Sequence, residues 1–356
     1  MVMIEPAPMK ISANVPTNSA SNRAGAFSTR YASCGTKSHV DYGTTFARIR
    51  HFPADTAKMQ RMFAFTHDRW SFPLPPTNRF PQQKYRLVRE RVERLPGVDV
   101  LEGAPITWDD ALLVHEAEWV RRIRYGLLTR HEEAALGLTW SPELAQRTLH
   151  ATGSTVAATR AALTDGVAAA LGGGTHHAHR AVGRGYCLVN DVAVSLELIR
   201  LDGFIGKCLI LDLDVHQGDG NADCFADDPD VFVVSIHGEQ NYPFVRVPSD
   251  IDIDVPDCTG DDDYLALLDG VLDGLDRHAP FDLAFLLCGA DPWEGDRLGR
   301  LALTLPGLEE RDRRAIGWIR DRGIPLVVTL AGGYGEPIET TADIQARSVA
   351  LAAERG

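Results

Sequence analysis

The chain has 356 residues, of which 44% are hydrophobic and 24% charged, and its formal net charge is −13. This composition is ordinary for a soluble globular protein, and the length suits one large domain or two modest ones. The negative charge argues against direct binding of nucleic acid. No uninterrupted apolar run approaches the roughly 20 residues of a membrane helix, so no membrane partner is expected.

The six cysteines include no CxxC pair, and several lie in apolar runs where thiols act as small buried hydrophobes. The sequence therefore indicates no disulfide framework and favours a reducing compartment. The amino-terminal region also lacks the apolar core of a signal peptide. We expect a cytoplasmic location.

Residues 1–58 are rich in Ser, Thr, Ala, Asn and Gly and have no sustained hydrophobic periodicity. We expect a flexible amino-terminal extension over residues 1–61. A more regular pattern begins at Met62, and we assign residues 62–356 to a single catalytic domain.

Taken in chain order, the pattern predicts a Pro-rich loop at 72–80 and then helices over 82–95, 142–163 and 192–201. Four short apolar runs lack polar alternation, as strands buried on both faces do; they are 207–213, 231–236, 282–287 and 325–330. Helical patterns follow at 262–275, 308–322 and 342–354. Strands alternating with helices predict an α/β fold, with a parallel β-sheet flanked by helices in one domain.

The segment Asp212-Leu-Asp-Val-His-Gln-Gly-Asp219 follows an apolar run and carries the clearest chemical signal. Asp214 and His216 are two residues apart, so their side chains point the same way in an extended segment. A carboxylate and an imidazole converging at a strand end can fill two positions of a divalent metal. A solvated Asp-rich loop is the alternative interpretation.

A second cluster places the adjacent histidines His176 and His177 directly after a run of glycines. An unperturbed imidazole titrates at about pH 6.5, so such a pair suits proton transfer. A His-rich surface loop is the alternative. His179, two residues further on, is expected to be structural or solvent-exposed.

Asp291 and Tyr334 each follow an apolar run. Asp291 is either the N-cap of a following helix or a third metal ligand beside Asp214 and His216, which would match a catalytic zinc site. Tyr334 lies between glycines that would let its phenol project into a cleft, unless it is a packed aromatic in a turn. Together, a metal, an imidazole base and a phenol predict metal-assisted hydrolysis of an amide.

These motifs, with Gly185-Tyr-Cys-Leu-Val-Asn-Asp191 between them, occur in the order seen in zinc-dependent histone deacetylases. Over residues 62–356 the chain resembles the class IV branch of that family and its bacterial relatives. The resemblance implies the arginase/deacetylase fold, with zinc held by Asp214, His216 and Asp291. It also implies a potassium ion bound by Asp212, by main-chain oxygens of Asp214 and His216, and by Ser235 and Ile236.

By the same resemblance, His177 is the general base, and His176 gives electrostatic help or shares the proton transfer. Asp212 would orient His176, and Asp219 would orient His177. Tyr334 would donate a hydrogen bond to the substrate carbonyl oxygen.

The resemblance also implies that Tyr186 lines a narrow acyl-lysine channel, which Gly185 and Gly333 keep slim. The leading hypothesis is a zinc-dependent deacylase that acts on an acyl-lysine protein. One alternative is a small-molecule amidohydrolase for acetylpolyamines or a biosynthetic N-acyl amine. Others are a catalytically weak acyl-lysine binding protein and a ureohydrolase with two manganese ions, which would need further bridging carboxylates.

Overall fold

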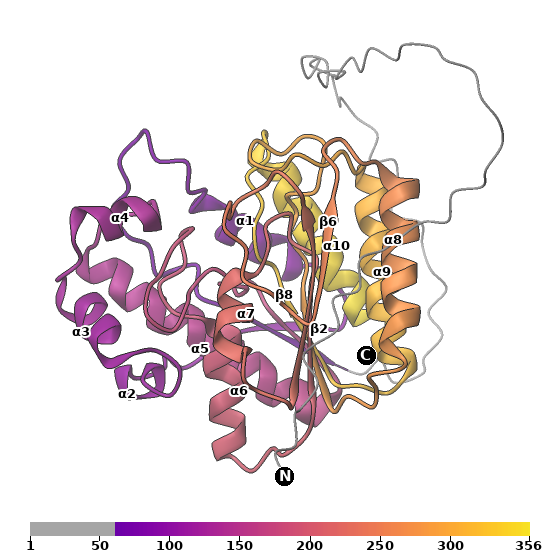
Figure 1. The fold of residues 1–356 in the computed structure, drawn as a ribbon, viewed down its shortest axis with the longest axis horizontal. Coiled ribbons are helices and arrows are strands. Elements are labelled where there is room, and N and C mark those ends of the chain that lie inside the picture. The colour runs from indigo at the N-terminus through magenta and orange to yellow at the C-terminus, as the bar shows by residue number, and fades with distance from the viewer. Residues whose placement is uncertain (1–60) are drawn as a thin grey trace, which may run out of the picture. The chain divides into compact units, whose positions relative to one another are not determined.

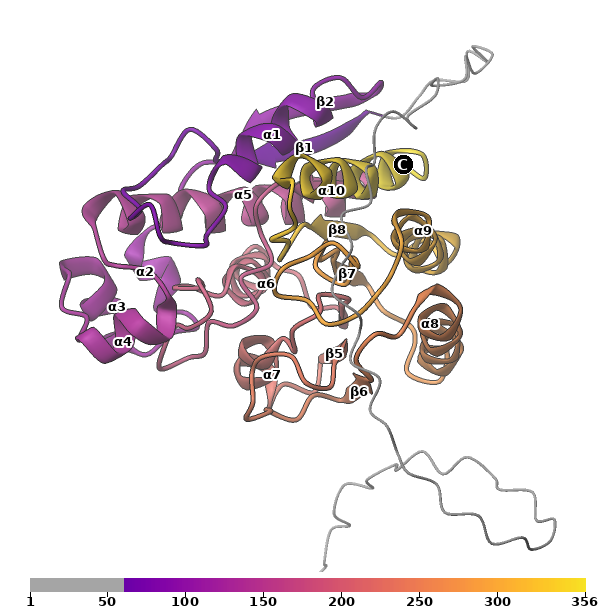
Figure 2. The ribbon, with the colours of Figure 1, turned by 90° about the horizontal axis from the view of Figure 1, so that it is seen from above.

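A computed structural model describes residues 61–356, and these residues form one eight-stranded sheet (Figures 1 and 2). The strand order is β2-β1-β3-β8-β7-β4-β5-β6, and every neighbouring pair runs parallel. The strands are β1 Met62–Thr66, β2 Val98–Glu102, β3 Val167–Ala170, β4 Cys208–Asp212, β5 Val231–Gly238, β6 Ile251–Val255, β7 Leu283–Leu287 and β8 Leu326–Thr329.

Helices cover both faces of the sheet, as Figure 2 shows. One face is covered by α1 Gln83–Val92, α8 Asp261–Leu275, α9 Leu305–Asp321 and α10 Ile338–Ala353. The other is covered by α5 Pro142–Asp165, α6 Asp191–Leu201 and α7 Asp219–Phe225, with α2 Trp108–Ala111, α3 Ala117–Tyr125 and α4 Arg130–Leu136 beside them. The prediction of a parallel sheet flanked by helices is confirmed.

The central strands contribute side chains to both hydrophobic cores, because successive side chains of a strand point to opposite faces. In β4, Leu209 and Leu211 belong to the core under α8, α9 and α10, whereas Cys208 and Ile210 belong to the core under α5 and α6. All four are fully buried. This two-sided burial explains why β4 shows no polar alternation in the sequence.

The long helix α5 begins and ends where its sequence predicts. The Ser141 hydroxyl accepts a hydrogen bond from Leu144 N as N-cap, Pro142 occupies the first turn, and Gly166 closes the helix. Gly153, in the middle, allows another segment to lie against the helix, since a Cβ there would come within 2.0 Å of the Ala104 carbonyl oxygen.

Four of the eight strands were predicted, namely β4, β5, β7 and β8, and the other four were missed. β3 reads Val-Ala-Ala-Ala, and alanine is a helix former rather than a strand former. The predicted helix over 82–95 ends at Val92 as α1, because Pro96 disfavours helical backbone at the residue before it.

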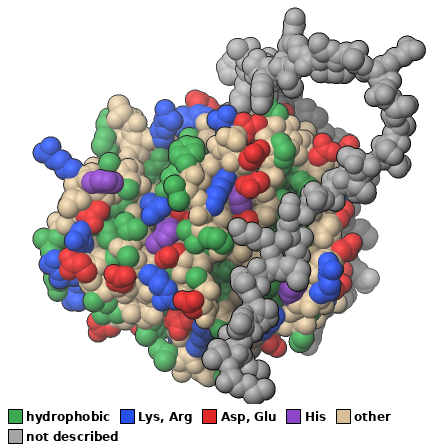
Figure 3. Space-filling view, in the orientation of Figure 1, with side chains coloured by type: hydrophobic (Ala, Val, Ile, Leu, Met, Phe, Trp, Pro, Cys, Tyr) green, Lys and Arg blue, Asp and Glu red, His purple; other side chains and the backbone are tan. Residues whose placement is uncertain are grey.

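No helix among residues 61–356 is long and apolar enough to cross a membrane. On the face drawn in Figure 3, acidic and basic side chains are interspersed with hydrophobic ones. The expected extension over residues 1–61 lies outside the described residues, except for Arg61.

Candidate active site

Four adjacent strands carry the site-forming segments at their carboxyl ends. β3 is followed by His176 and His177, β8 by Tyr334, β7 by Asp291, and β4 ends at Asp212. These strands are neighbours in the order β3-β8-β7-β4. Because parallel strands all end at the same edge of the sheet, residues far apart in sequence meet there.

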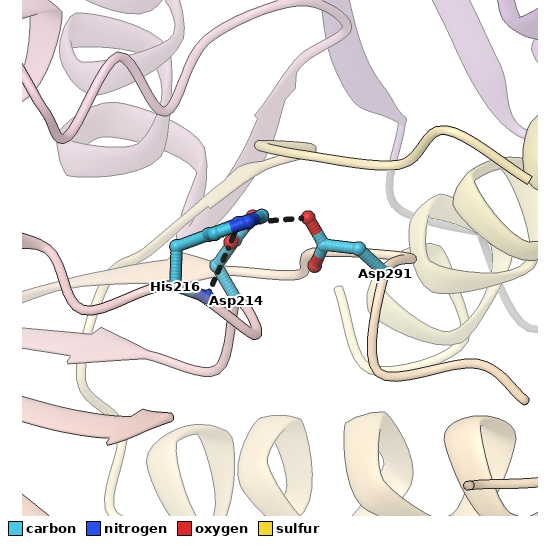
Figure 4. Close-up of side chains that lie close together, drawn as sticks. All are labelled: Asp214, His216 and Asp291. Carbon is cyan, nitrogen blue, oxygen red and sulfur yellow. Dashed lines mark hydrogen bonds and ion pairs between the residues drawn. The ribbon is translucent and has the colours of Figure 1, made fainter. Parts of the chain in front are cut away.

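Asp214, His216 and Asp291 form a cluster that can hold a metal ion (Figure 4). They offer one ligand atom each, and these atoms lie within 4.8 Å of one another. His216 Nδ1 is 2.9 Å from Asp214 Oδ1 and 3.3 Å from Asp291 Oδ2. Asp291 is fully buried and begins no helix, so it is not an N-cap.

The hydrogen bonds around the cluster fit a zinc ion. Asp291 Oδ1 accepts from Val215 N at 3.0 Å. Its Oδ2 is buried and makes no hydrogen bond within residues 61–356, and only the ion-pair contact with His216 Nδ1, at 3.3 Å, lies beside it. Asp214 is held in place by Gly332 N, which donates to Oδ2 at 2.7 Å. A divalent cation would satisfy Asp291 Oδ2 and balance both carboxylates, and an Asp-His-Asp set leaves positions open for water and substrate.

The electrostatics of the cluster also favour a cation. Burial alone would lower the pKa of His216, but the Asp214 and Asp291 carboxylates raise it to about 10. Burial and the nearby Asp214 charge raise the pKa of Asp291 to about 6. Both pKa shifts arise because two carboxylates lie close together in a buried site. A bound cation would offset the repulsion between them.

Glycine is required where the β8 loop passes the cluster. A Cβ on Gly332 would lie 2.0 Å from Asp291 Oδ2 and 2.6 Å from Asp214 Oδ2. A Cβ on Gly289 would lie 2.6 Å from Asp214 Cα. The glycines of the sequence motifs therefore let two loops close on the metal ligands.

Two buried histidine–aspartate pairs lie beside the cluster. His176 Nδ1 is 2.7 Å from Asp212 Oδ2, and His177 Nδ1 is 2.6 Å from Asp219 Oδ1. The two imidazole rings lie 4.2 Å apart, centroid to centroid. Since each Nδ1 is paired with a carboxylate, the Nε2 atom of each ring remains for substrate chemistry.

The two histidines have opposite pKa shifts. Burial lowers the pKa of His177 to about 4, helped by the neighbouring His176, against the opposing Asp219. Burial acts the same way on His176, but the Asp212 and Asp214 carboxylates outweigh it and raise the pKa to about 9. At neutral pH His177 is therefore neutral and able to accept a proton, whereas His176 is charged.

His179 extends this network. It is buried, and its Nε2 lies 2.8 Å from Asp219 Oδ2, the oxygen that does not contact His177. Its Nδ1 lies 3.4 Å from Asp223 Oδ2, and Arg184 Nη1 is 3.6 Å from Asp219 Oδ2. The structural interpretation of His179 therefore holds, and the solvent-exposed one is wrong.

Tyr334, in the loop after β8, lines a cavity that Asp214 and His216 also line. Its backbone N donates to Asp296 Oδ2 at 2.6 Å, and Asp296 Oδ1 accepts from Gly299 N at 2.9 Å. Burial, with Tyr85 and Asp291 nearby, raises the pKa of the Tyr334 phenol well above its usual value. The phenol therefore stays protonated and can donate a hydrogen bond. Sequence reasoning did not identify Asp296 as the residue that anchors this loop.

Tyr186 and Gly185 form part of the cavity wall. Gly185 has a φ of 55°, and a Cβ there would lie 2.6 Å from His177 Cδ2. The Tyr186 ring lies 5.8 Å from the Tyr334 ring and 5.3 Å from the Phe80 ring, centroid to centroid. All three aromatic residues line the cavity.

Gly333 does not line this cavity. Its Cβ position faces Thr341 on α10 at 2.6 Å, and Gly332 is the lining residue instead. The sequence prediction that Gly333 borders the channel is therefore replaced by Gly332, one residue earlier.

The cavity has a volume of about 430 Å³, and its lining includes both predicted ligands of the β4 loop, both paired histidines and Tyr334. Tyr242 and Phe244 contribute to its wall, and the Phe244 side chain is 84% exposed, which marks the opening to solvent. Asp214 is the single acidic residue among the described lining residues, which also include Lys84 and Arg147. Sequence reasoning missed these two cations because they lie on helices distant from every motif.

Ser235 and Ile236, predicted to bind potassium, are fully buried on β5, where Ser235 pairs in register with Asp212 on β4. Ser235 Oγ lies 2.9 Å from His237 Nδ1. The segment that follows Asp212 carries the other predicted oxygens. The potassium site remains a prediction.

A buried arginine supports the metal-binding loops from behind. Arg311 Nη1 donates to the carbonyl oxygens of Leu213 at 3.1 Å and Gly289 at 2.8 Å, next to two of the predicted metal ligands. Asp312 Oδ1 accepts from Arg311 Nε at 2.8 Å, and Ser348 Oγ donates to Asp312 Oδ2 at 2.5 Å. This network ties α9 and α10 to the site.

Comparisons with known proteins agree with this geometry. The chain is 40% identical over 276 residues to an uncharacterized protein of Picosynechococcus, covering 76% of this chain and 92% of that one. It is 29% identical over 246 residues to histone deacetylase 2 of Arabidopsis thaliana, covering 67% of this chain and 63% of that protein. The crystal structure of a histone deacetylase homolog from Aquifex aeolicus shares the fold, with a TM-score of 0.66 and 22% identity over 83% of each chain.

The model of the histone deacetylase domain matches residues 78–350, which include every site residue described above. Several relatives are named deacetylases, among them the Arabidopsis protein and a probable deacetylase of Archaeoglobus fulgidus. The chain therefore belongs to the histone deacetylase family and is a deacetylase-type amide hydrolase.

Proposed function

We propose that this protein hydrolyses the side-chain amide of N-acyl-lysine in a zinc-dependent reaction. One observation carries the proposal: Asp214 and His216 of the metal-ligand cluster, the histidines of both histidine–aspartate pairs and Tyr334 all line a single cavity. A catalytically weak binding protein would not need this complete set. A ureohydrolase would need a second group of metal ligands. Residues 61–356 contain a single group of clustered ligands, Asp214, His216 and Asp291.

Each residue has a distinct part in the proposed reaction. A bound zinc ion would polarise the acyl carbonyl and lower the pKa of water. His177 Nε2 would take a proton from the attacking water and later pass a proton to the leaving amine, because its pKa leaves it neutral. Tyr334 would donate to the carbonyl oxygen as negative charge develops there. Charged His176 would add electrostatic stabilisation.

The lining of the cavity favours acyl-lysine over an acetylpolyamine. A polyamine carries further cationic nitrogens, and these would need carboxylates along the wall. Asp214, a metal ligand in this proposal, is the single acidic residue among the described lining residues. The Asp296 carboxylate already accepts hydrogen bonds from three backbone N–H groups, so it does not supply a partner for a polyamine nitrogen.

Two further assignments belong to this proposal. A potassium ion near Asp212 and Ser235 would lie behind His176 and influence its basicity. A reducing, cytoplasmic setting fits the cysteines, because the five in the described region are free thiols and four of them are buried.

Substrate panels test the proposal directly. We expect kcat/KM for acetyl-lysine peptides to exceed that for acetylputrescine and acetylspermidine. A preference for the polyamines of tenfold or more, about 1.4 kcal/mol in transition-state free energy, would reverse the assignment.

His177→Ala is the matched chemical control for this assay. The variant should lose turnover and keep its zinc, because His177 is assigned as a base and is not part of the ligand cluster. His176→Ala should also reduce turnover, but by less than His177→Ala does. Rates near wild type for His177→Ala would show that another group accepts the proton.

A further inference from the structure

The inner end of the cavity is basic. Three side chains surround the ring of Tyr85: the Arg147 guanidinium carbon lies 4.3 Å from its centroid, Lys84 Nζ 5.4 Å, and the His67 ring centroid 5.3 Å. Lys84, Arg147 and His67 are each at least 95% buried, and all four residues line the cavity. We call these four residues the basic end.

The two cations of the basic end form no ion pair within the described part of the chain. Neither Lys84 nor Arg147 forms an ion pair with any residue in the range 61–356. Lys84 Nζ carries three N–H groups and donates one hydrogen bond, to Ala331 O at 3.2 Å. Both ring nitrogens of His67 are buried without a hydrogen-bond partner. Lys84 and His67 therefore have unused hydrogen-bonding capacity beside the Arg147 guanidinium, whose Nη1 donates to Trp70 O at 2.7 Å.

Nearby carboxylates do not fill this role. Asp68 is paired with Arg89, whose Nε lies 2.9 Å from its Oδ2. Asp191 accepts hydrogen bonds from Gly174 N at 2.9 Å and from the Thr155 hydroxyl at 2.5 Å. Because an unpaired buried charge is costly, a ligand that brings its own carboxylate to the basic end would be favoured.

The position of the basic end relates it to the acyl group of the substrate. Lys84 Nζ lies 5.8 Å from the ring centroid of Tyr334, the proposed donor to the acyl carbonyl oxygen. The lysine stem of a substrate would enter past the exposed Phe244, so its acyl chain would extend inward, beyond Tyr334. The far end of that chain would then meet Lys84 and Arg147.

We propose that the enzyme prefers acyl groups that end in a carboxylate, such as succinyl-lysine or glutaryl-lysine, and that the basic end binds that carboxylate. This inference rests on the proposed deacylase function and specifies its substrate class. In the reaction, the water oxygen bonds to the acyl carbon, the C–N bond breaks, and the lysine nitrogen takes a proton. The products are a free lysine side chain and a dicarboxylate.

The test compares two acyl-lysine peptides that differ in one terminal group. Glutaryl-lysine ends in a carboxylate, and glutaramyl-lysine has the same length with a neutral amide. For the wild-type protein we expect kcat/KM to be at least tenfold higher for the glutaryl peptide, because charge-assisted hydrogen bonds are stronger than neutral ones. Acetyl-lysine peptide is measured in parallel.

Substitutions locate the preference. Lys84→Met should reduce the glutaryl-to-glutaramyl ratio at least tenfold, and Lys84→Arg should retain most of it. Lys207→Met is the matched control: Lys207 also donates to one carbonyl oxygen, of His278 at 2.8 Å, and lies over aromatic rings. Lys207 precedes the amino end of β4, whereas the site lies at the carboxyl ends of the strands, so the ratio should not change.

The outcomes separate this inference from the proposed function. Equal kcat/KM for the two peptides in the wild-type protein would overturn the inference, whether or not Lys84→Met folds. Acetyl-lysine turnover without glutaryl-lysine turnover would do the same and leave the deacylase assignment intact. Inhibition by free acetate that depends on Lys84, without a preference for glutaryl, would assign the basic end to the released acid instead. No turnover of any acyl-lysine would remove the proposed function itself.

Discussion

At the scale of single residues, the phenol of Tyr334 has the most specific chemical role. Its raised pKa keeps the proton on the hydroxyl, and Asp296 holds its backbone in place. We predict that Tyr334→Phe lowers kcat by roughly 10²–10³-fold, the range for loss of one oxyanion donor. KM should change less, because the aromatic ring remains in the cavity wall.

Steady-state kinetics on acetyl-lysine peptide measure this effect. Tyr125→Phe serves as the control, since Tyr125 is an exposed residue of α3 and does not line the cavity. An unchanged kcat in Tyr334→Phe would mean that the phenol does not reach the reacting carbonyl.

Residue types and spacing could predict the metal-ligand cluster but not the groups that support it. Asp214 and His216 share a short segment, and the motif order linked them to Asp291. His179 was left undecided because its partner, Asp219, is brought to it only by the fold. Lys84 belongs to a helix that carries no motif, so its place in the cavity could not be read from the sequence.

At the scale of elements, apolar runs predicted the strands that are buried on both faces. The missed strands have other compositions: β3 consists largely of alanine, and β6, at the sheet edge, alternates Ile and Asp. A short edge strand has one neighbour and less burial, so its pattern resembles a loop. The prediction of the site did not depend on the missed strands, because β4, β7 and β8, which carry most of the site, were all predicted.

The loop after β8 gives a prediction at this scale. Gly332→Ala would place a Cβ 2.0 Å from Asp291 Oδ2, too close for any relaxed structure. We expect weakened zinc binding and loss of activity, measured by competition with a zinc chelator and by peptide hydrolysis.

Gly270→Ala is the matched control for that substitution. Gly270 lies in α8 with no neighbouring atom within 4 Å of its Cβ position. Alanine there should leave zinc binding unaltered and stabilise the protein by about 1 kcal/mol through helix propensity. Wild-type zinc affinity in Gly332→Ala would mean that the loop can move away from the ligands.

At the scale of the whole molecule, the motif order predicted the family and fold together. The individual patterns were ambiguous, but their sequence along the chain fitted one architecture. The class IV assignment, the potassium ion and the acyl group remain predictions, because they depend on side-chain details beyond the shared motifs.

The domain boundary can be tested by truncation. We predict that a protein starting at Met62 folds and retains its kcat/KM. Met62 begins β1, which is paired on both sides with β2 and β3. The described interaction lost is the ion pair of Arg61 with Asp99 at 3.2 Å, and exposed pairs of this kind contribute about 1 kcal/mol or less. Thermal unfolding and the peptide assay measure the result; aggregation, or loss of zinc, would show that residues 1–61 belong to the folded domain.

The central claim is that one zinc ion, held by Asp214, His216 and Asp291, supports hydrolysis of acyl-lysine. The most direct test is to strip the protein of metal with a chelator and to follow acyl-lysine hydrolysis while zinc is added back. The account predicts that activity is absent without metal and rises to a plateau at one zinc per chain. Activity that needs two manganese ions per chain, or that persists after complete metal removal, would contradict it.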